Sequence, residues 1–192
     1  MKQTIRQYLE EHQRVLARLS DQAESLAGLA QVMRATLDRG GRILVFGNGG
    51  SAADAQHFCA ELVGGFRLKN GHRPAVALGA DAAVLTALGN DFGFDKIFAL
   101  QVEALASAED LVLGLTTSGR SSNVLEGLRA ARCKGAATAC LCGARADLVS
   151  PLCDQVVSVP SEQTSHIQEA HGVILHICAL LIEQAAARES QR

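Results

Sequence analysis

The sequence contains no tryptophan and a single tyrosine among its 192 residues. With so few large aromatic rings, it offers no platform on which the bases of single-stranded nucleic acid would stack. An excess of one charge is also missing, because 18 lysines and arginines face 20 aspartates and glutamates without any basic or acidic block. These features exclude an electrostatic footprint for nucleic acid, and we expect no nucleic-acid partner.

No uninterrupted apolar run approaches membrane-spanning length, and the first residues, MKQTIRQYLEEHQRV, are too charged for a signal peptide. We therefore expect a cytoplasmic protein with no membrane partner. The cysteines form no C-x-x-C pair and most lie in apolar patterns, which favours small buried side chains over disulfides or a metal site. They are Cys59, Cys133, Cys140, Cys142, Cys153 and Cys178.

Hydrophobic residues make up 48% of the sequence and charged residues 20%, and this length and composition predict one globular domain, residues 1–192. Leucines recur at helical spacing through residues 2–38, with a break near SDQAE that divides the stretch into two helices. We interpret residues 1–38 as an N-terminal helical arm. Its apolar stripe has to be buried, and a second subunit is one candidate.

Residues 42–188 follow a different pattern, in which short apolar runs alternate with helical segments. The runs are nearly continuous rather than alternating, as expected of strands buried on both faces of a parallel sheet. The predicted fold class is α/β, a three-layer α/β/α sandwich with a five-stranded parallel sheet. The five expected strands lie at 42–47, 75–78, 110–117, 136–143 and 155–160.

Two of these runs end in small polar loops that lead into helices: GNGGSAAD (47–54) and TTSGRSSN (116–123). Ligands of open parallel sheets bind at the carboxyl ends of the strands, where helix N-termini favour a phosphate. The alternative is that the serines only cap their helices. Because two loops share this design, we favour a sugar phosphate. The candidate hydroxyl donors are Ser51, Thr116, Thr117, Ser118 and Ser121.

His57 and Glu61 are four residues apart on one helical pattern, and Gln168 and His176 are eight apart on another. Each pair projects from one face of its helix, and both segments are otherwise apolar. A histidine on such a face is often only a core residue with a satisfied hydrogen bond. If the two helices converge, the four side chains suit either Zn²⁺ or acid–base catalysis. Sequence spacing does not show whether they converge.

Asn90 and Asp91 occur in the glycine-flanked segment GNDFGF (89–94). Both are ordinary turn-forming residues, although their side chains are also able to hydrogen-bond a polyol. From the residues alone we interpret this segment as a turn.

Together, FGNGGSAADAQHFCAEL, GNDFGF, TTSGRSSNV and HIQEAHGVILH resemble the phosphoheptose isomerases, which are sugar isomerase (SIS) domain proteins. The resemblance covers nearly the whole chain. It implies a flavodoxin-like fold and a homotetramer with active sites formed between subunits. The implied reaction converts D-sedoheptulose 7-phosphate into D-glycero-D-manno-heptose 7-phosphate, the first step of heptose precursor biosynthesis for lipopolysaccharide-type glycans.

The resemblance also assigns roles to residues. It implies substrate binding by Asn48, Gly49, Gly50, Asn90 and Asp91, and phosphate binding by Thr116, Thr117, Ser118 and Ser121; we add Ser51, from its hydroxyl group, to the substrate-binding residues. It implies one Zn²⁺ per subunit held by His57, Glu61, Gln168 and His176, with Glu61 and Gln168 also touching substrate. The chain departs from the family pattern at three places: Arg67 lies two residues beyond the usual arginine at position 65, Arg120 replaces an asparagine, and His166 replaces an arginine.

An aldose–ketose isomerisation moves a proton between C1 and C2 through an enediol and needs a base and an acid. We assign Glu61 as the base, because burial on an apolar helix face would raise the pKa of a carboxyl group, and His176 as the acid. Zinc would either polarise the substrate oxygens or be partly structural, with His176 acting when metal-free.

A related SIS branch binds the replication initiator DnaA without catalysis, and a sugar-phosphate-sensing SIS module is a third possibility. As we identify it, the DnaA-binding branch lacks an acidic residue at the position of Glu61 and a histidine at the position of His176. The presence of both residues in this chain therefore favours the enzyme.

Overall fold

The computed structural model describes residues 1–67 and 72–189, and its centre is a parallel sheet. Five strands in this part of the chain pair in the order β2-β1-β3-β4-β5, each parallel to its neighbours. This is the flavodoxin-like strand order. The five expected strands are thus confirmed as β1 (Ile43–Gly47), β2 (Ala75–Ala77), β3 (Leu111–Thr116), β4 (Ala137–Cys142) and β5 (Gln155–Ser158).

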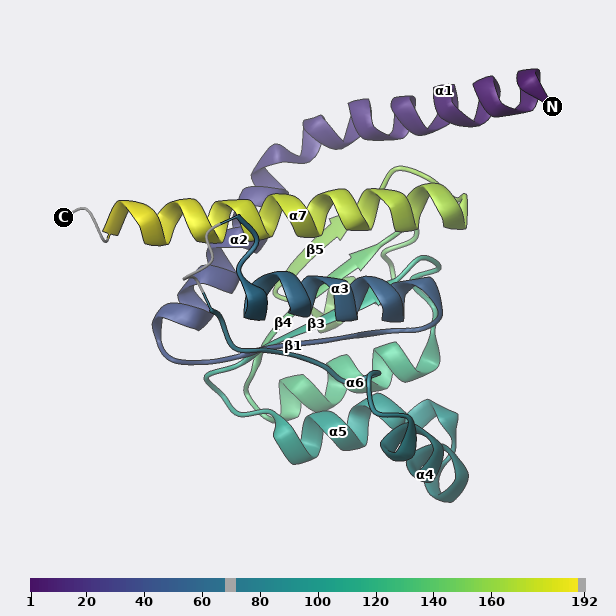
Figure 1. The fold of residues 1–192 in the computed structure, drawn as a ribbon. Helices are drawn as coiled ribbons and strands as arrows, with labels where there is room; N and C mark the ends of the chain where they lie inside the picture. The colour runs from purple at the N-terminus through teal and green to yellow at the C-terminus, as the bar shows by residue number, and fades with distance from the viewer. Residues whose placement is uncertain (68–71, 190–192) are drawn as a thin grey trace.

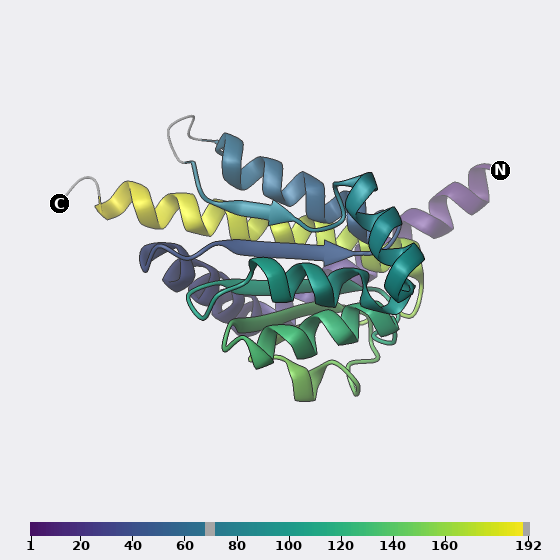
Figure 2. The same ribbon diagram turned by 90° about the horizontal axis from the view of Figure 1, so that it is seen from below.

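Helices cover both faces of the sheet and make the three predicted layers (Figure 1). The longer helices are α1 (Lys2–Leu19), α2 (Ala23–Asp38), α3 (Gly50–Gly64), α4 (Ala82–Phe92), α5 (Ile97–Leu105), α6 (Ser122–Cys133) and α7 (Thr164–Glu189). Short 3₁₀ turns lie at Ser20–Gln22, Phe94–Lys96 and Ser150–Leu152. One outer layer contains α2, α3 and α7, and the other contains α4, α5 and α6, as the view from below also shows (Figure 2).

Two hydrophobic cores follow from the two-residue period of the strands. In β1, Val45 faces the core beneath α2, α3 and α7, whereas Leu44 and Phe46 face the core beneath α5 and α6. The Phe46 ring stacks on the Phe98 ring of α5, with centroids 4.8 Å apart. Residues of β1, β3 and most of β4 are buried, which explains their continuous apolar runs.

The N-terminal arm divides at the expected break, since Ser20–Gln22 forms a 3₁₀ turn between α1 and α2. The two halves differ in burial. In α2, Leu29 and Met33 are buried in the core beneath α7, so this helix belongs to the sandwich. The first helix, α1, projects beyond it (Figure 1), and Ile5 and Leu9 remain about half exposed.

The helix α7 is long and apolar enough over Thr164–Ala187 to cross a membrane, judged by length and composition. In this fold it packs against α2 and α3, with Ala170, Ile174 and Cys178 fully buried. A helix that lies between other elements needs the same apolar composition as a membrane span. Its place in the core therefore explains the apolar residues on its buried face, whereas Val173 and Leu181 remain exposed.

His171 of α7 is fully buried, with its Nε2 atom 3.4 Å from the carbonyl oxygen of Cys142. Burial lowers the pKa of this imidazole from 6.5 to about 4. The unfolded chain takes up a proton near pH 6.5 and the folded chain only near pH 4, so stability is lost as the pH falls through this window. We expect the free energy of unfolding to drop by about 2 kcal/mol between pH 7 and pH 5, measured by denaturant titration. An unchanged pH dependence in His171→Phe would contradict this assignment.

The six cysteines are all free thiols. Cys59, Cys140, Cys142 and Cys178 are buried as expected, and burial raises the pKa of Cys59 and Cys178 to about 12. The expectation was wrong for Cys133, which is exposed at the last position of α6, and Cys153 is only partly buried. The apolar pattern around Cys133 belongs to the opposite face of that helix.

Candidate active site

The first polar loop connects β1 to α3 and approaches β3 closely. A Cβ atom on Gly47 would lie 2.8 Å from the carbonyl oxygen of Leu115, so only glycine permits this approach. Gly49 has a φ of +57°, a conformation that side chains disfavour. Ser51 is buried, and α3 has no side-chain capping hydrogen bond at its N-terminus. The capping interpretation of Ser51 is therefore wrong.

The second loop brings three hydroxyl groups together at the end of β3. The Oγ1 atom of Thr116 lies 3.2 Å from Oγ of Ser121 and 3.4 Å from Oγ of Ser118. Ser121 occupies the N-cap position of α6, yet its side chain makes no capping hydrogen bond. The hydroxyl of Ser118 accepts a hydrogen bond from the backbone N–H of Arg120, within the loop itself. Converging hydroxyls at a helix N-terminus that lacks a side-chain cap are suited to an anion.

An amide pair that the sequence did not reveal joins the two loops. Asn48 donates to Asn123 at 2.8 Å, and Asn123 donates back at 2.9 Å. Asn123 is buried in the first turn of α6, where an asparagine would otherwise be expected to cap rather than to lie inside the helix. The pair fixes the spacing of the two loops. In this structure the Asn48 side chain contacts α6, and its predicted role in substrate binding stays a prediction.

The helices α3 and α7 run side by side, so the convergence that spacing did not show is present (Figure 1). The Nε2 atoms of His57 and His176 are 2.9 Å apart, and Nε2 of His57 is 3.5 Å from Oε1 of Glu61. One ligand atom from each of these three side chains lies within 4.8 Å of the others. Two nitrogens on one tetrahedral zinc ion are about 3.3 Å apart. The nitrogen and oxygen donors therefore fit a metal of the zinc type in both kind and spacing.

Gln168 lies two turns before His176 on α7 and covers the start of α3. A Cβ atom on Gly50 would lie only 2.5 Å from Nε2 of Gln168, so this glycine makes room for the amide. The amide is thus located over the first polar loop, on the helix that also carries His176. That Gln168 is the fourth zinc ligand or contacts the substrate stays a prediction.

Asn90 and Asp91 do not form the predicted turn, because they occupy the last turn of α4. Asp81 caps the start of this helix through two backbone N–H groups, and Gly93, with a φ of +87°, ends it. The helix therefore continues through Gly89. Both side chains are exposed, and their one hydrogen bond among the described residues joins them to each other. This hydrogen bond does not join them to either polar loop, and their predicted role in substrate binding stays a prediction.

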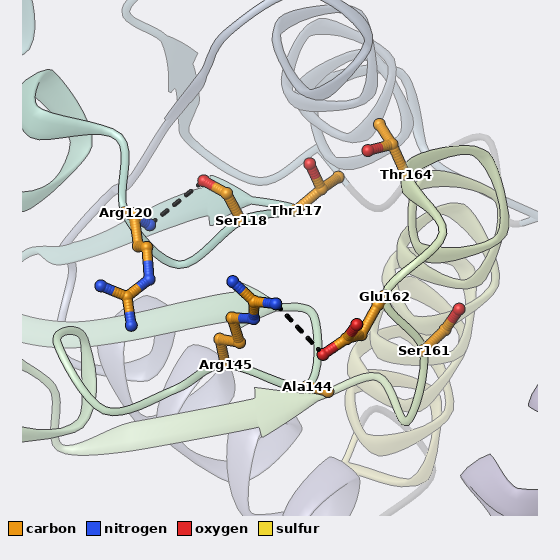
Figure 3. Close-up of a pocket in the computed structure, with 8 residues that line it drawn as sticks. All are labelled: Thr117, Ser118, Arg120, Ala144, Arg145, Ser161, Glu162 and Thr164. Atoms are coloured by element: carbon orange, nitrogen blue, oxygen red, sulfur yellow. Dashed lines mark hydrogen bonds and ion pairs between the residues drawn. The ribbon is translucent and has the colours of Figure 1, made fainter.

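A polar hollow of about 220 Å³ lies beside the second loop, between the ends of β3, β4 and β5 and the start of α7 (Figure 3). Arg120 lines it, and its guanidinium pairs with Asp147 at 3.1 Å while remaining half exposed. Arg145 pairs with Glu162 at 3.4 Å across the same hollow. Both positive charges are therefore matched by carboxylates.

Comparison with known proteins agrees with this architecture. The SIS domain family model matches residues 7–143. The phosphoheptose isomerase of Solidesulfovibrio magneticus is 51% identical over 180 residues, covering 93% of this chain and 88% of that protein. The phosphoheptose isomerase of Geobacter sulfurreducens is 48% identical over 179 residues, covering 93% and 92%. The solved phosphoheptose isomerase of Neisseria gonorrhoeae superimposes with a TM-score of 0.90 at 36% identity, covering 95% and 98%. The chain belongs to the phosphoheptose isomerase family of SIS-domain proteins.

Proposed function

We propose that this protein is an aldose–ketose isomerase that converts D-sedoheptulose 7-phosphate into D-glycero-D-manno-heptose 7-phosphate. The observation that carries the proposal is the meeting of Glu61 with His57 and His176, from two helices, in a chain of this family. We further propose that residues 1–192 form one domain, that the protein is cytoplasmic, and that it performs the first step of heptose precursor biosynthesis for lipopolysaccharide-type glycans.

In the proposed mechanism Glu61 takes a proton from C1 of the ketose and returns it to C2. In the metal-free site, His176 protonates the C2 oxygen and accepts the proton of the C1 hydroxyl, so the enediol collapses to the aldose. The Glu61 side chain is only a quarter exposed, which limits competing water around the carboxylate. The position of His176 close to Glu61 and His57 supports this division between base and acid.

We propose one Zn²⁺ per subunit, held by His57, Glu61 and His176 with Gln168 as the fourth ligand. When bound, the ion would supply Lewis-acid polarisation of the substrate oxygens. The three side chains whose donor atoms already lie close together support this proposal through their chemistry and spacing.

A turnover assay tests the function against its two alternatives. Incubation with sedoheptulose 7-phosphate is expected to form the aldose 7-phosphate, detected by NMR or chromatography. Binding of the ketose without product would instead indicate a sugar-phosphate-sensing module. Neither binding nor product, together with association with the replication initiator DnaA, would indicate the non-catalytic branch. The presence of both Glu61 and His176 favours the enzyme.

We propose phosphate binding by the hydroxyls of the second loop, with no lysine or arginine required. A hydroxyl that binds a charged group contributes about 1.5–3 kcal/mol, so Ser118→Ala and Ser121→Ala should each raise KM about 10- to 100-fold. Arg120→Ala should change KM by less than about threefold, because its guanidinium is half exposed and paired with Asp147. Steady-state kinetics with the phosphorylated and unphosphorylated ketose measure these effects, and the unphosphorylated sugar should be a very poor substrate. A larger loss in Arg120→Ala than in either serine variant would contradict the hydroxyl cradle.

We also propose a homotetramer. An apolar groove of about 370 Å³ runs between the N-terminal helices and α7, and Val173 and Leu181 are exposed along it. Together with the exposed Ile5 and Leu9 of α1, it is apolar surface that a second subunit would bury. Light scattering at micromolar concentration should give a mass near four chains.

The variant Leu181→Asp places a carboxylate in the groove and should reduce the mass of the assembly, because an interface cannot solvate the charge. Leu105→Asp serves as the matched control, since Leu105 is also exposed but lies on α5 in the opposite layer. A monomeric wild-type protein, or the same mass for all three proteins, would overturn the groove as an interface.

A further inference from the structure

Two aromatic rings contact the imidazole of His176. The ring of His57 meets it nearly edge-on, with centroids 5.1 Å apart and an interplanar angle of 72°. The ring of Phe66 lies almost parallel to it, with centroids 5.3 Å apart and an angle of 20°. His176 is therefore in contact with one ring that belongs to the candidate metal cluster and one that has no polar atom.

The helix that carries His57 and Glu61 also delivers Phe66. The helix α3 ends at Gly64, and Gly65 adopts a φ of +86° while its N–H donates to the carbonyl oxygen of Glu61. A left-handed glycine at this position reverses the chain direction. Phe66, the next residue, then lies over His176 of the neighbouring helix.

The segment after this turn is fastened to α7. The backbone N–H of Arg67 donates to both carboxylate oxygens of Glu183, at 2.9 and 3.0 Å. Glu183 is buried and lies two helical turns beyond His176. The guanidinium carbon of Arg67 is 5.4 Å from the centroid of the Phe66 ring, which adds a cation–π contact. Phe66 is thus held between an anchored neighbour and the imidazole.

We propose that Phe66 is a positioning residue that fixes the ring plane of His176. The χ2 torsion of histidine has a broad energy minimum, so an unsupported imidazole rotates easily about it. The stacked phenyl ring restricts this rotation and keeps Nε2 of His176 directed at His57, 2.9 Å away. The expected effect of Phe66 on turnover rests on the proposed function, whereas its effect on the orientation of the His176 ring does not.

The test compares Phe66→Leu, which keeps apolar volume without a ring, with Phe66→Tyr, which keeps the ring. In NMR spectra, the ring current of residue 66 should shift the His176 ring protons in wild type and Phe66→Tyr, and this shift should vanish in Phe66→Leu. His176→Gln identifies the resonances. In Phe66→Leu, the kcat for sedoheptulose 7-phosphate should fall about tenfold while KM stays within about twofold of wild type. In Phe66→Tyr, kcat should also stay within about twofold of wild type.

Val63→Ala is the matched control, because Val63 is an exposed apolar residue near the same end of α3. It should leave both the His176 resonances and kcat unchanged. If the His176 resonances of Phe66→Leu stay at their wild-type positions, the proposal is overturned. A kcat of Phe66→Leu within about twofold of wild type, or an equal loss in Phe66→Tyr, would overturn it as well. Should Phe66→Leu fail to fold, Phe66→Met makes the same comparison. If the wild type shows no turnover, the proposed function fails, while the NMR comparison still decides the positioning.

Discussion

Glu61→Gln should lower turnover of sedoheptulose 7-phosphate by a factor of about 10² to 10⁴, the usual contribution of a positioned general base. The amide has nearly the same shape as the carboxylate but does not accept a proton from carbon. The side chain is partly exposed and 3.5 Å from Nε2 of His57, so the change should leave the fold and the assembly intact. Steady-state kinetics measure the loss, and circular dichroism and light scattering check the structure.

Glu103→Gln makes the same chemical change at an exposed position of α5, in the layer opposite the one that carries His57, Glu61 and His176. It should keep turnover within about twofold of wild type. If Glu61→Gln retains activity within a few-fold of wild type, Glu61 is not the base. The proton transfer would then have to be assigned to another group.

The second large effect concerns metal. Protein prepared without chelator should contain close to one zinc ion per chain, and His57→Ala and His176→Ala should each lose nearly all of it. Each variant removes one of the two imidazole donors of the proposed four-ligand site, and the remaining imidazole, carboxylate and amide should hold zinc poorly. Elemental analysis of the purified proteins measures the ratio of zinc to chain.

The matched control is His72→Ala, because His72 is exposed and its Nδ1 atom contacts the carbonyl oxygen of Val63 instead of the cluster. It should keep its zinc. Absence of a transition metal in the wild type would count against the site. Zinc that survived both histidine changes would indicate ligation elsewhere, with the cysteines as the first candidates.

The sequence predicted β1, β3 and β4 well because strands buried on both faces carry mostly apolar residues, so their positions stand out as continuous apolar runs. The division of the arm was also visible, since Ser20–Gln22 interrupts the leucine spacing. The different burial of α1 and α2 was not visible, because both carry an apolar stripe and only tertiary packing selects which one is covered.

The candidate site was predictable in its residues but not in its geometry. Helical spacing placed His57 beside Glu61, whereas their meeting with His176 depends on how two crossovers pack on one sheet face. The pairing of Asn48 with Asn123 depends likewise on two loops far apart in sequence. Local turn propensity was misleading at Asn90, because the helix cap at Asp81 and the stop at Gly93 outweigh it.

Isomerisation in D₂O followed by NMR tests the central claim most directly, namely that a carboxylate on α3 moves a proton between C1 and C2. Because Glu61 is partly exposed, its proton should exchange with solvent during the lifetime of the enediol. We predict that wild-type protein converts sedoheptulose 7-phosphate into the aldose 7-phosphate with solvent deuterium at C2, and that Glu61→Gln slows both conversion and exchange. No aldose product, or a product formed by the wild type without any solvent deuterium, would contradict the account.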